Sequence, residues 1–146
     1  MSEKKILIVD DEIDFVRILS AHLKARGYST VSASDAVGAI MVAQKENPDF
    51  IILDVNMPAG NGFTVMERLA KFDRTSLIPV IVVTGKVLTG RQRAMAAGAV
   101  GFFTKPVDFD QLLTLIGDLL GQPVGAGERE QKESVYSLPE SYNLDE

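Results

Sequence analysis

The chain lacks several features, and each absence narrows the class of protein it can be. Its 146 residues contain no cysteine, which excludes a disulfide framework and a thiolate metal site. No apolar run approaches the ~18 residues typical of a transmembrane helix, and the N-terminus has no signal-peptide core. The net charge is −5 without a basic stripe, which disfavours direct nucleic-acid binding. We therefore expect a single cytoplasmic domain that binds neither membranes nor nucleic acids.

The charge is unevenly distributed along the chain. Residues 122–146 carry a net charge of −4, whereas residues 1–121 carry −1. After Gly121, a stretch rich in glycine leads into the acidic segment. We predict a folded domain at 1–121 and an acidic linker or tail at 122–146. The tail either has no fixed structure or docks on the domain or on a partner through Tyr136, Leu138, Tyr142 and Leu144.

Short apolar runs alternate with stretches of helical period in the first 121 residues. Such runs are typical of strands buried on both faces of a parallel sheet. We expect five strands, at 6–9, 28–33, 50–53, 80–83 and 101–104. A helix should follow each strand, the last four at 36–46 behind the N-cap Asp35, 63–71, 89–97 and 109–120 behind the N-cap Asp108.

The stretch 55–62 is rich in glycine, proline and asparagine and is expected to be a loop. Parallel strands joined by right-handed helical crossovers form a doubly wound α/β fold. The pattern therefore predicts a (βα)5 three-layer sandwich around a five-stranded parallel sheet.

Polar or charged side chains close the four strongest apolar runs. These residues are Asp10, Asp11, Asp54, Thr84 and Lys105. Ligands of open α/β sheets bind beyond the carboxyl ends of the strands, so these side chains are expected to meet there. Carboxylates held close together raise each other's pKa unless a cation neutralises them. A hard divalent cation fits these oxygen ligands, and Mg²⁺ fits best; helix capping is the alternative role for either Asp10 or Asp11 alone.

The remaining polar residues fit phosphoryl chemistry. Lys105 follows an apolar run, where a lone ammonium group is costly to bury, so we expect it to face the carboxylates and then a phosphoryl group. Pro106 makes a cis peptide bond possible there. Thr84, beside Gly85, is either a plain strand residue or a donor to a phosphoryl oxygen. Asp54 is the best candidate nucleophile, because a carboxylate that attacks phosphorus forms an acyl phosphate.

Together these motifs resemble the receiver domain of bacterial response regulators. The resemblance spans about residues 4–120 and rests on Asp10-Asp11, Asp54-Val55-Asn56-Met57-Pro58 leading to Asn61-Gly62, Thr84-Gly85 and Lys105-Pro106. It implies a flavodoxin-like fold with strand order 2-1-3-4-5. It also implies a two-component phosphorelay, in which Asp54 accepts a phosphoryl group from the phosphohistidine of a sensor histidine kinase or a histidine phosphotransferase.

The resemblance also assigns roles around Asp54. Asp11 and Asp54 would bind Mg²⁺ through their side chains, Asn56 through its backbone carbonyl, and Asp10 mostly through water. Thr84 and Lys105 would contact the phosphoryl oxygens and have catalytic roles. Such a protein is a phosphoacceptor that assists its own phosphorylation and dephosphorylation, and it is not otherwise an enzyme.

The resemblance further implies a conformational switch and an output surface. Phe102 matches an aromatic position that swings inward together with Thr84, although it lacks the hydroxyl of the tyrosine that is frequent there. Plain core packing is the alternative role for Phe102. A downstream protein, or a second copy of the chain, would bind the face formed by the fourth helix, the fifth strand and the fifth helix.

Three alternatives belong to other classes. A receiver-like interaction module would never be phosphorylated, but the full set of acidic, Thr and Lys residues argues against it. A small Mg²⁺-dependent phosphatase with an aspartyl nucleophile would carry Asp-x-Asp-x-Thr after the first strand, and the chain has Asp10-Asp11-Glu12-Ile13-Asp14. A nucleotide-binding module would need a glycine-rich loop at this place, where the acidic residues would instead repel phosphates.

Overall fold

The computed structural model describes residues 3–57, 60–85 and 90–121. The expected acidic tail at 122–146 lies outside the described residues. The elements follow the chain in this order: β1 (Lys5–Val9), α1 (Ile13–Ala25), β2 (Ser29–Ala33), α2 (Ala36–Glu46), β3 (Phe50–Leu53), β4 (Asn56–Met57), β5 (Gly60–Asn61), α3 (Gly62–Leu69), β6 (Val80–Thr84), α4 (Gly90–Ala96), β7 (Gly101–Thr104) and α5 (Phe109–Leu120).

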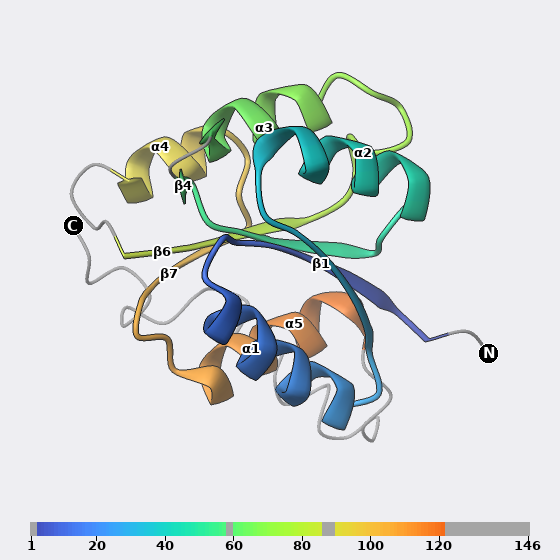
Figure 1. Cartoon of the computed structure of the whole chain (residues 1–146), viewed down its shortest axis with the longest axis vertical. Coiled ribbons are helices and arrows are strands. Elements are labelled where there is room, and N and C mark those ends of the chain that lie inside the picture. Colours follow the sequence, from blue (N-terminus) through green and yellow to red (C-terminus); the bar gives the residue numbers. More distant parts are fainter. Residues whose placement is uncertain (1–2, 58–59, 86–89, 122–146) are drawn as a thin grey trace.

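Five parallel strands form the central sheet in the order β2-β1-β3-β6-β7. Because β4 and β5 form a separate hairpin, this order corresponds to the predicted 2-1-3-4-5. Figure 1 shows α1 and α5 on one face of the sheet, and α2, α3 and α4 on the other. The predicted doubly wound α/β sandwich is confirmed.

The strands alternate their side chains between two cores, as the period of two along a strand requires. Leu7, Ile51 and Val82 pack beneath α2, α3 and α4, whereas Ile8 and Ile52 pack toward α1 and α5. All five side chains are at most 1% exposed. Burial on both faces explains why these strands are continuous apolar runs, since full burial of one such side chain contributes about 1.5–3 kcal/mol.

The helix starts follow the predicted capping. Asp35 accepts a hydrogen bond from the Gly38 N–H at 2.7 Å, and Asp108 accepts one from the Gln111 N–H at 3.1 Å. Each carboxylate satisfies a backbone donor that has no partner within the helix. Both predicted N-caps are confirmed, and α2 and α5 have the predicted bounds.

The expectation of a plain loop at 55–62 is wrong in part. Asn56 pairs with Asn61, and Met57 with Gly60, in an antiparallel hairpin of two short strands. Strands of two residues are too short to leave a periodic pattern in a sequence, which is why only the turn residues were visible. The hairpin returns the chain to Gly62, where α3 begins directly beside the end of β3.

Helix α3 ends at Leu69 and not at the predicted Lys71. The N–H groups of Lys71 and Phe72 bond to carbonyls three residues earlier, Arg68 O and Leu69 O, so the last turn is tighter than an α-helix. The buried Thr75 hydroxyl then donates to Leu69 O at 2.6 Å. A side chain from the following segment thus satisfies a carbonyl at the helix end, a contact that the helical period could not reveal.

Candidate functional site

The carboxyl ends of four strands bring the predicted site residues together. Asp10 follows β1, Asp54 follows β3, Thr84 ends β6 and Lys105 follows β7. The ends of β1 and β3 are level, because Val9 pairs with Leu53, and those of β6 and β7 are level, because Thr84 pairs with Thr104. Leu53 pairs with Val82, so β6 extends two residues further than β3. Short parallel strands in register therefore place residues that are up to 95 positions apart at one edge of the sheet.

Asp10, Asp11 and Asp54 form a compact acidic cluster. One carboxylate oxygen from each lies within 4.8 Å of the others. Asp10 and Asp54 are buried, at 4% and 5% exposure, whereas Asp11 is exposed. A set of three oxygen donors that is partly open to solvent fits a hard divalent cation that keeps several waters, as Mg²⁺ does.

Burial dominates the electrostatics of Asp10. It raises the pKa of the carboxyl above its ordinary value, and the nearby charge of Asp54 adds to this. Hydrogen bonds from Lys105 and from the Glu12 N–H act in the opposite direction without cancelling the effect of burial. The ionised carboxylate is therefore held at a cost, which a bound cation would reduce.

Lys105 lies at the centre of this negative region. Its Nζ is 2.7 Å from Asp10 Oδ2 and 3.3 Å from Asp54 Oδ2, and it also bonds to Glu12 Oε1. Burial alone would lower the pKa of the ammonium group, but the bonds to Asp10 and Glu12 and the charges of Asp10 and Asp54 outweigh it, so the pKa lies above its ordinary value. Lys105 is consequently a fixed positive charge next to Asp54, on a chain whose peptide bond to Pro106 is cis.

The backbone after Asp54 turns back to hold its carboxylate. The Asn56 N–H donates to Asp54 Oδ1 at 2.8 Å, which leaves Oδ2 directed at Lys105. Asn56 itself is exposed at the start of the β4–β5 hairpin. The Asp54 side chain is thus oriented by one contact at each oxygen, and Asn56 lies at the open side of the site.

Thr84 and Phe102 lie inside the protein. Thr84 is 0% exposed and its carbonyl accepts a hydrogen bond from the Lys105 N–H at 3.0 Å. Phe102 is 2% exposed, and its ring lies beside Gly90 at the start of α4, where an added Cβ would be 3.5 Å from Cζ. The aromatic position that the resemblance names as a switch is therefore buried, with its ring beside the start of α4.

Two residues of the site were missed by reasoning from the sequence. Glu12 bonds to Lys105, and the ring of Phe15 lies beneath the ammonium group, 4.5 Å from Nζ to the ring centroid. The sequence held one signal for Glu12, because glutamate is an unusual residue at the N-cap of a helix. Phe15 carried none, since its position fits an ordinary apolar helix face.

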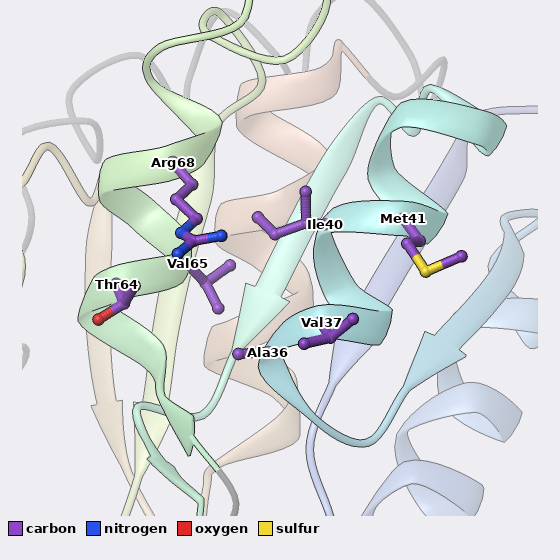
Figure 2. Close-up of a pocket in the computed structure, with 7 residues that line it drawn as sticks. All are labelled: Ala36, Val37, Ile40, Met41, Thr64, Val65 and Arg68. Atoms are coloured by element: carbon purple, nitrogen blue, oxygen red, sulfur yellow. The ribbon is translucent and has the colours of Figure 1, made fainter.

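An apolar groove, with a volume of about 300 Å³, lies between α2 and α3. Figure 2 shows its lining residues, with Val37, Ile40 and Met41 on α2 and Val65 and Arg68 on α3. Among the described residues that line it, none is a carboxylate and Arg68 alone is charged. The carboxylates and the ammonium group that suit a cation and a phosphoryl group therefore lie at the strand ends and not in this apolar groove.

Comparison with known proteins agrees with the fold. The sequence profile of the response regulator receiver domain matches residues 6–117. This chain belongs to the response regulator receiver domain family of two-component systems. Receiver domains are signalling phosphoacceptors that generally bind Mg²⁺ in an acidic pocket and interact with histidine kinases and output domains.

Two individual response regulator relatives are similar in sequence to most of this chain. The chain is 38% identical to Protein PilH of Pseudomonas aeruginosa over 117 residues, which cover 80% of this chain and 97% of PilH. It is 37% identical to Response regulator PleD of Caulobacter vibrioides over 131 residues, which cover 89% of this chain but only 29% of PleD. The chain thus spans less than a third of PleD and nearly all of PilH.

Solved structures of response regulators also have a fold similar to that of this chain. Chemotaxis response regulator CheY4 of Vibrio cholerae matches with a TM-score of 0.72 and 32% identity, over 79% of this chain and 97% of that chain. A putative response regulator from Chloroflexus aurantiacus matches with a TM-score of 0.76 and 26% identity. Among the described residues, no helix is long and apolar enough to cross a membrane.

Proposed function

We propose that this chain accepts a phosphoryl group on Asp54 from the phosphohistidine of a sensor histidine kinase or a histidine phosphotransferase. The observation that carries the proposal is the position of Asp54. Its buried carboxylate lies 3.3 Å from the Lys105 ammonium and belongs to the cluster with Asp10 and Asp11. Positive charge and a cation-binding set beside one oriented carboxylate are what phosphoryl transfer requires.

In the transfer, an Asp54 carboxylate oxygen attacks phosphorus and the bond between phosphorus and the histidine nitrogen breaks. The electron pair of that bond returns to the imidazole, and an acyl phosphate forms on Asp54. Lys105 offsets the charge of the phosphoryl oxygens, and the Thr84 hydroxyl donates to one of them once the side chains adjust. Each role rests on position at the strand ends.

Mg²⁺ is the cation that the donor set fits best. Asp11 and Asp54 would hold it by their side chains, Asn56 by its backbone carbonyl, and Asp10 mainly through water. When bound, Mg²⁺ would neutralise negative charge on the phosphoryl oxygens and on the clustered carboxylates. Because burial raises the pKa of Asp10, a cation at this place would also relieve an unfavourable buried charge.

The test is phosphorylation by acetyl phosphate with Mg²⁺, followed by intact mass measurement. A single phosphate adduct is expected for the wild type and for the control Asp14→Asn, and none for Asp54→Asn. Persistence of the adduct in Asp54→Asn would place phosphorylation elsewhere. Absence of an adduct from both a small donor and a kinase would support the interaction module that is never phosphorylated, and catalytic turnover of a phosphomonoester would support the phosphatase.

We further propose that output passes through the face formed by α4, β7 and α5, to a downstream protein or to a second copy of this chain. Strand β7 connects this face with the site, because it carries the buried Phe102 and leads directly into Lys105. We assign residues 1–121 to the receiver domain and 122–146 to an acidic segment beyond it, in a cytoplasmic protein. Light scattering with and without beryllofluoride, a phosphoryl mimic, would detect self-association through this face.

A further inference from the structure

Glu12 is the third carboxylate on the Lys105 ammonium group. An ammonium group has three N–H donors, and Lys105 Nζ directs them at Asp10, Asp54 and Glu12. The Lys105 side chain is only 16% exposed, so these partners hold a largely desolvated charge. The contact therefore differs from an ion pair between two exposed side chains, which contributes little to stability.

Helix capping does not explain where the Glu12 side chain lies. Glu12 is the N-cap of α1 with an extended backbone, yet its side chain makes no capping hydrogen bond. Asp35 and Asp108 occupy the same position in α2 and α5, and both cap their helices. The Glu12 N–H instead donates to Asp10 Oδ1 at 2.9 Å, which attaches the start of α1 to the acidic cluster.

The three carboxylates around Lys105 differ in whether they could also bind a cation. Asp10 and Asp54 belong to the set that could hold a cation, and their side chains are 2% and 6% exposed. Glu12 lies outside that set, and its side chain is 61% exposed. A cation in the cluster would therefore compete with Lys105 for Asp10 and Asp54, but not for Glu12.

Phe15 gives the ammonium group a second contact that does not involve the cluster of Asp10, Asp11 and Asp54. Its ring lies 4.5 Å from Nζ, within the range of a cation–π interaction. Both Glu12 and Phe15 come from the start of α1, so one element supplies both contacts. Lys105 can thus stay at the edge of the site without Asp10.

We propose that Glu12 is a positioning residue. It keeps Lys105 Nζ at the edge of the site when Asp10 and Asp54 interact with a divalent cation and a phosphoryl group. The inference rests on the proposed function, since it concerns the same cation and phosphoryl group. In the absence of Glu12, Asp10 and Asp54 are the carboxylate partners that remain to Lys105 among the described residues, and Lys105 competes more strongly with the cation for them. Removal of the Glu12 charge therefore weakens Mg²⁺ binding through Lys105.

The test is a double-mutant cycle on Mg²⁺ affinity, measured by calorimetric titration of the full chain. Glu12→Gln is expected to weaken Mg²⁺ binding about fivefold, the scale of one ion pair that is partly exposed. In a Lys105→Met background, Glu12→Gln should have no further effect. Asp14→Asn is the matched control, because it removes an exposed carboxylate two residues further along and should change the affinity less than twofold.

Equal weakening by Glu12→Gln and Asp14→Asn, or an undiminished effect of Glu12→Gln in the Lys105→Met background, would show that Glu12 acts only as general surface charge. Either result would overturn the proposal, as would a wild type that binds no Mg²⁺. Circular dichroism and urea unfolding of each variant separate a loss of fold from a loss of positioning. Failure of the proposed function is distinct, because it is the absence of an Asp54 phosphate adduct while the Mg²⁺ cycle keeps its expected form.

Discussion

Lys105 Nζ lies 2.7 Å from Asp10 Oδ2, although 95 positions separate the two residues in the chain. The pair joins the end of β7 to the end of β1, which are separated in the sheet by β3 and β6. Asp54 lies between them at the end of β3 and contacts Lys105 at 3.3 Å. Among the residues that the structure describes, one ammonium group therefore balances the charge of both buried carboxylates.

Lys105→Met should destabilise the protein in the absence of divalent cations. It leaves the buried carboxylates of Asp10 and Asp54 without their cationic partner, which we expect to cost about 2 kcal/mol of unfolding free energy. Urea unfolding at pH 7 measures this, and added Mg²⁺ should restore part of the loss. Lys5→Met is the control, because the pair of Lys5 with Glu46 is more exposed and its removal should have a much smaller effect.

The contribution of Asp10 to the stability of the cation-free protein should fall as pH rises above the ordinary range of aspartate. Burial raises the pKa of Asp10 above its ordinary value of 3.8, so the folded state holds this proton to higher pH than the unfolded state. In that window, the contribution of Asp10 to stability is present at low pH and is lost as pH rises through the folded-state pKa.

Asp10→Asn removes this titration while keeping an acceptor for the Glu12 N–H. The stability of Asp10→Asn relative to the wild type should therefore increase from pH 4 to pH 7, as followed by urea unfolding in a chelating buffer. Asp14→Asn should show no comparable trend. A stability of Asp10→Asn relative to the wild type that stays constant, or falls, as pH rises would contradict the assigned cause.

Substitution by alanine should destabilise the protein at Gly62 but not at Gly90. A Cβ at Gly62 would lie 2.4 Å from Val55 Cα and 2.9 Å from Asp54 O, both of them backbone atoms. Gly62→Ala should destabilise the protein by about 2–3 kcal/mol, because the chain just after Asp54 would have to move. A Cβ at Gly90 would only contact the Phe102 ring at 3.5 Å.

Gly90→Ala should accordingly be neutral or stabilise the protein by roughly 0.5 kcal/mol, since alanine loses less conformational freedom than glycine on folding. Thermal unfolding of both variants tests the contrast. Phosphorylation of Gly62→Ala by acetyl phosphate should also be slowed, while that of Gly90→Ala should match the wild type. Similar stability of the two variants would refute the close approach at Gly62.

Phe102 should keep its position when Asp54 is phosphorylated. Its ring is already 2% exposed, so phosphorylation cannot bury it appreciably further, and it has no hydroxyl to form a new hydrogen bond. Nuclear Overhauser effects between the Phe102 ring and Gly90 should persist after addition of beryllofluoride. Their loss would mean that the resting and activated proteins place this ring differently, and that Phe102 does switch.

Much of the fold was predictable because it depends on local patterns. Runs such as Phe50-Ile51-Ile52-Leu53 are apolar at every position, which is possible only where both faces of a strand are covered. The capping aspartates Asp35 and Asp108 marked two helix starts correctly. The β4–β5 hairpin and the end of α3 were not predictable, because they depend on backbone pairing and on the Thr75 contact rather than on a period.

The sequence by itself determined the strand–helix alternation and the chemical types at the strand ends, since both follow from short-range patterning and from the rule that ligands bind beyond the carboxyl ends of parallel strands. Only the tertiary structure decided which groups touch. It placed Glu12 and Phe15 against Lys105, oriented Asp54 through the Asn56 N–H, and buried Phe102 beside Gly90. These contacts join residues from different elements, and their geometry depends on how the helices pack across the sheet, which no local pattern encodes.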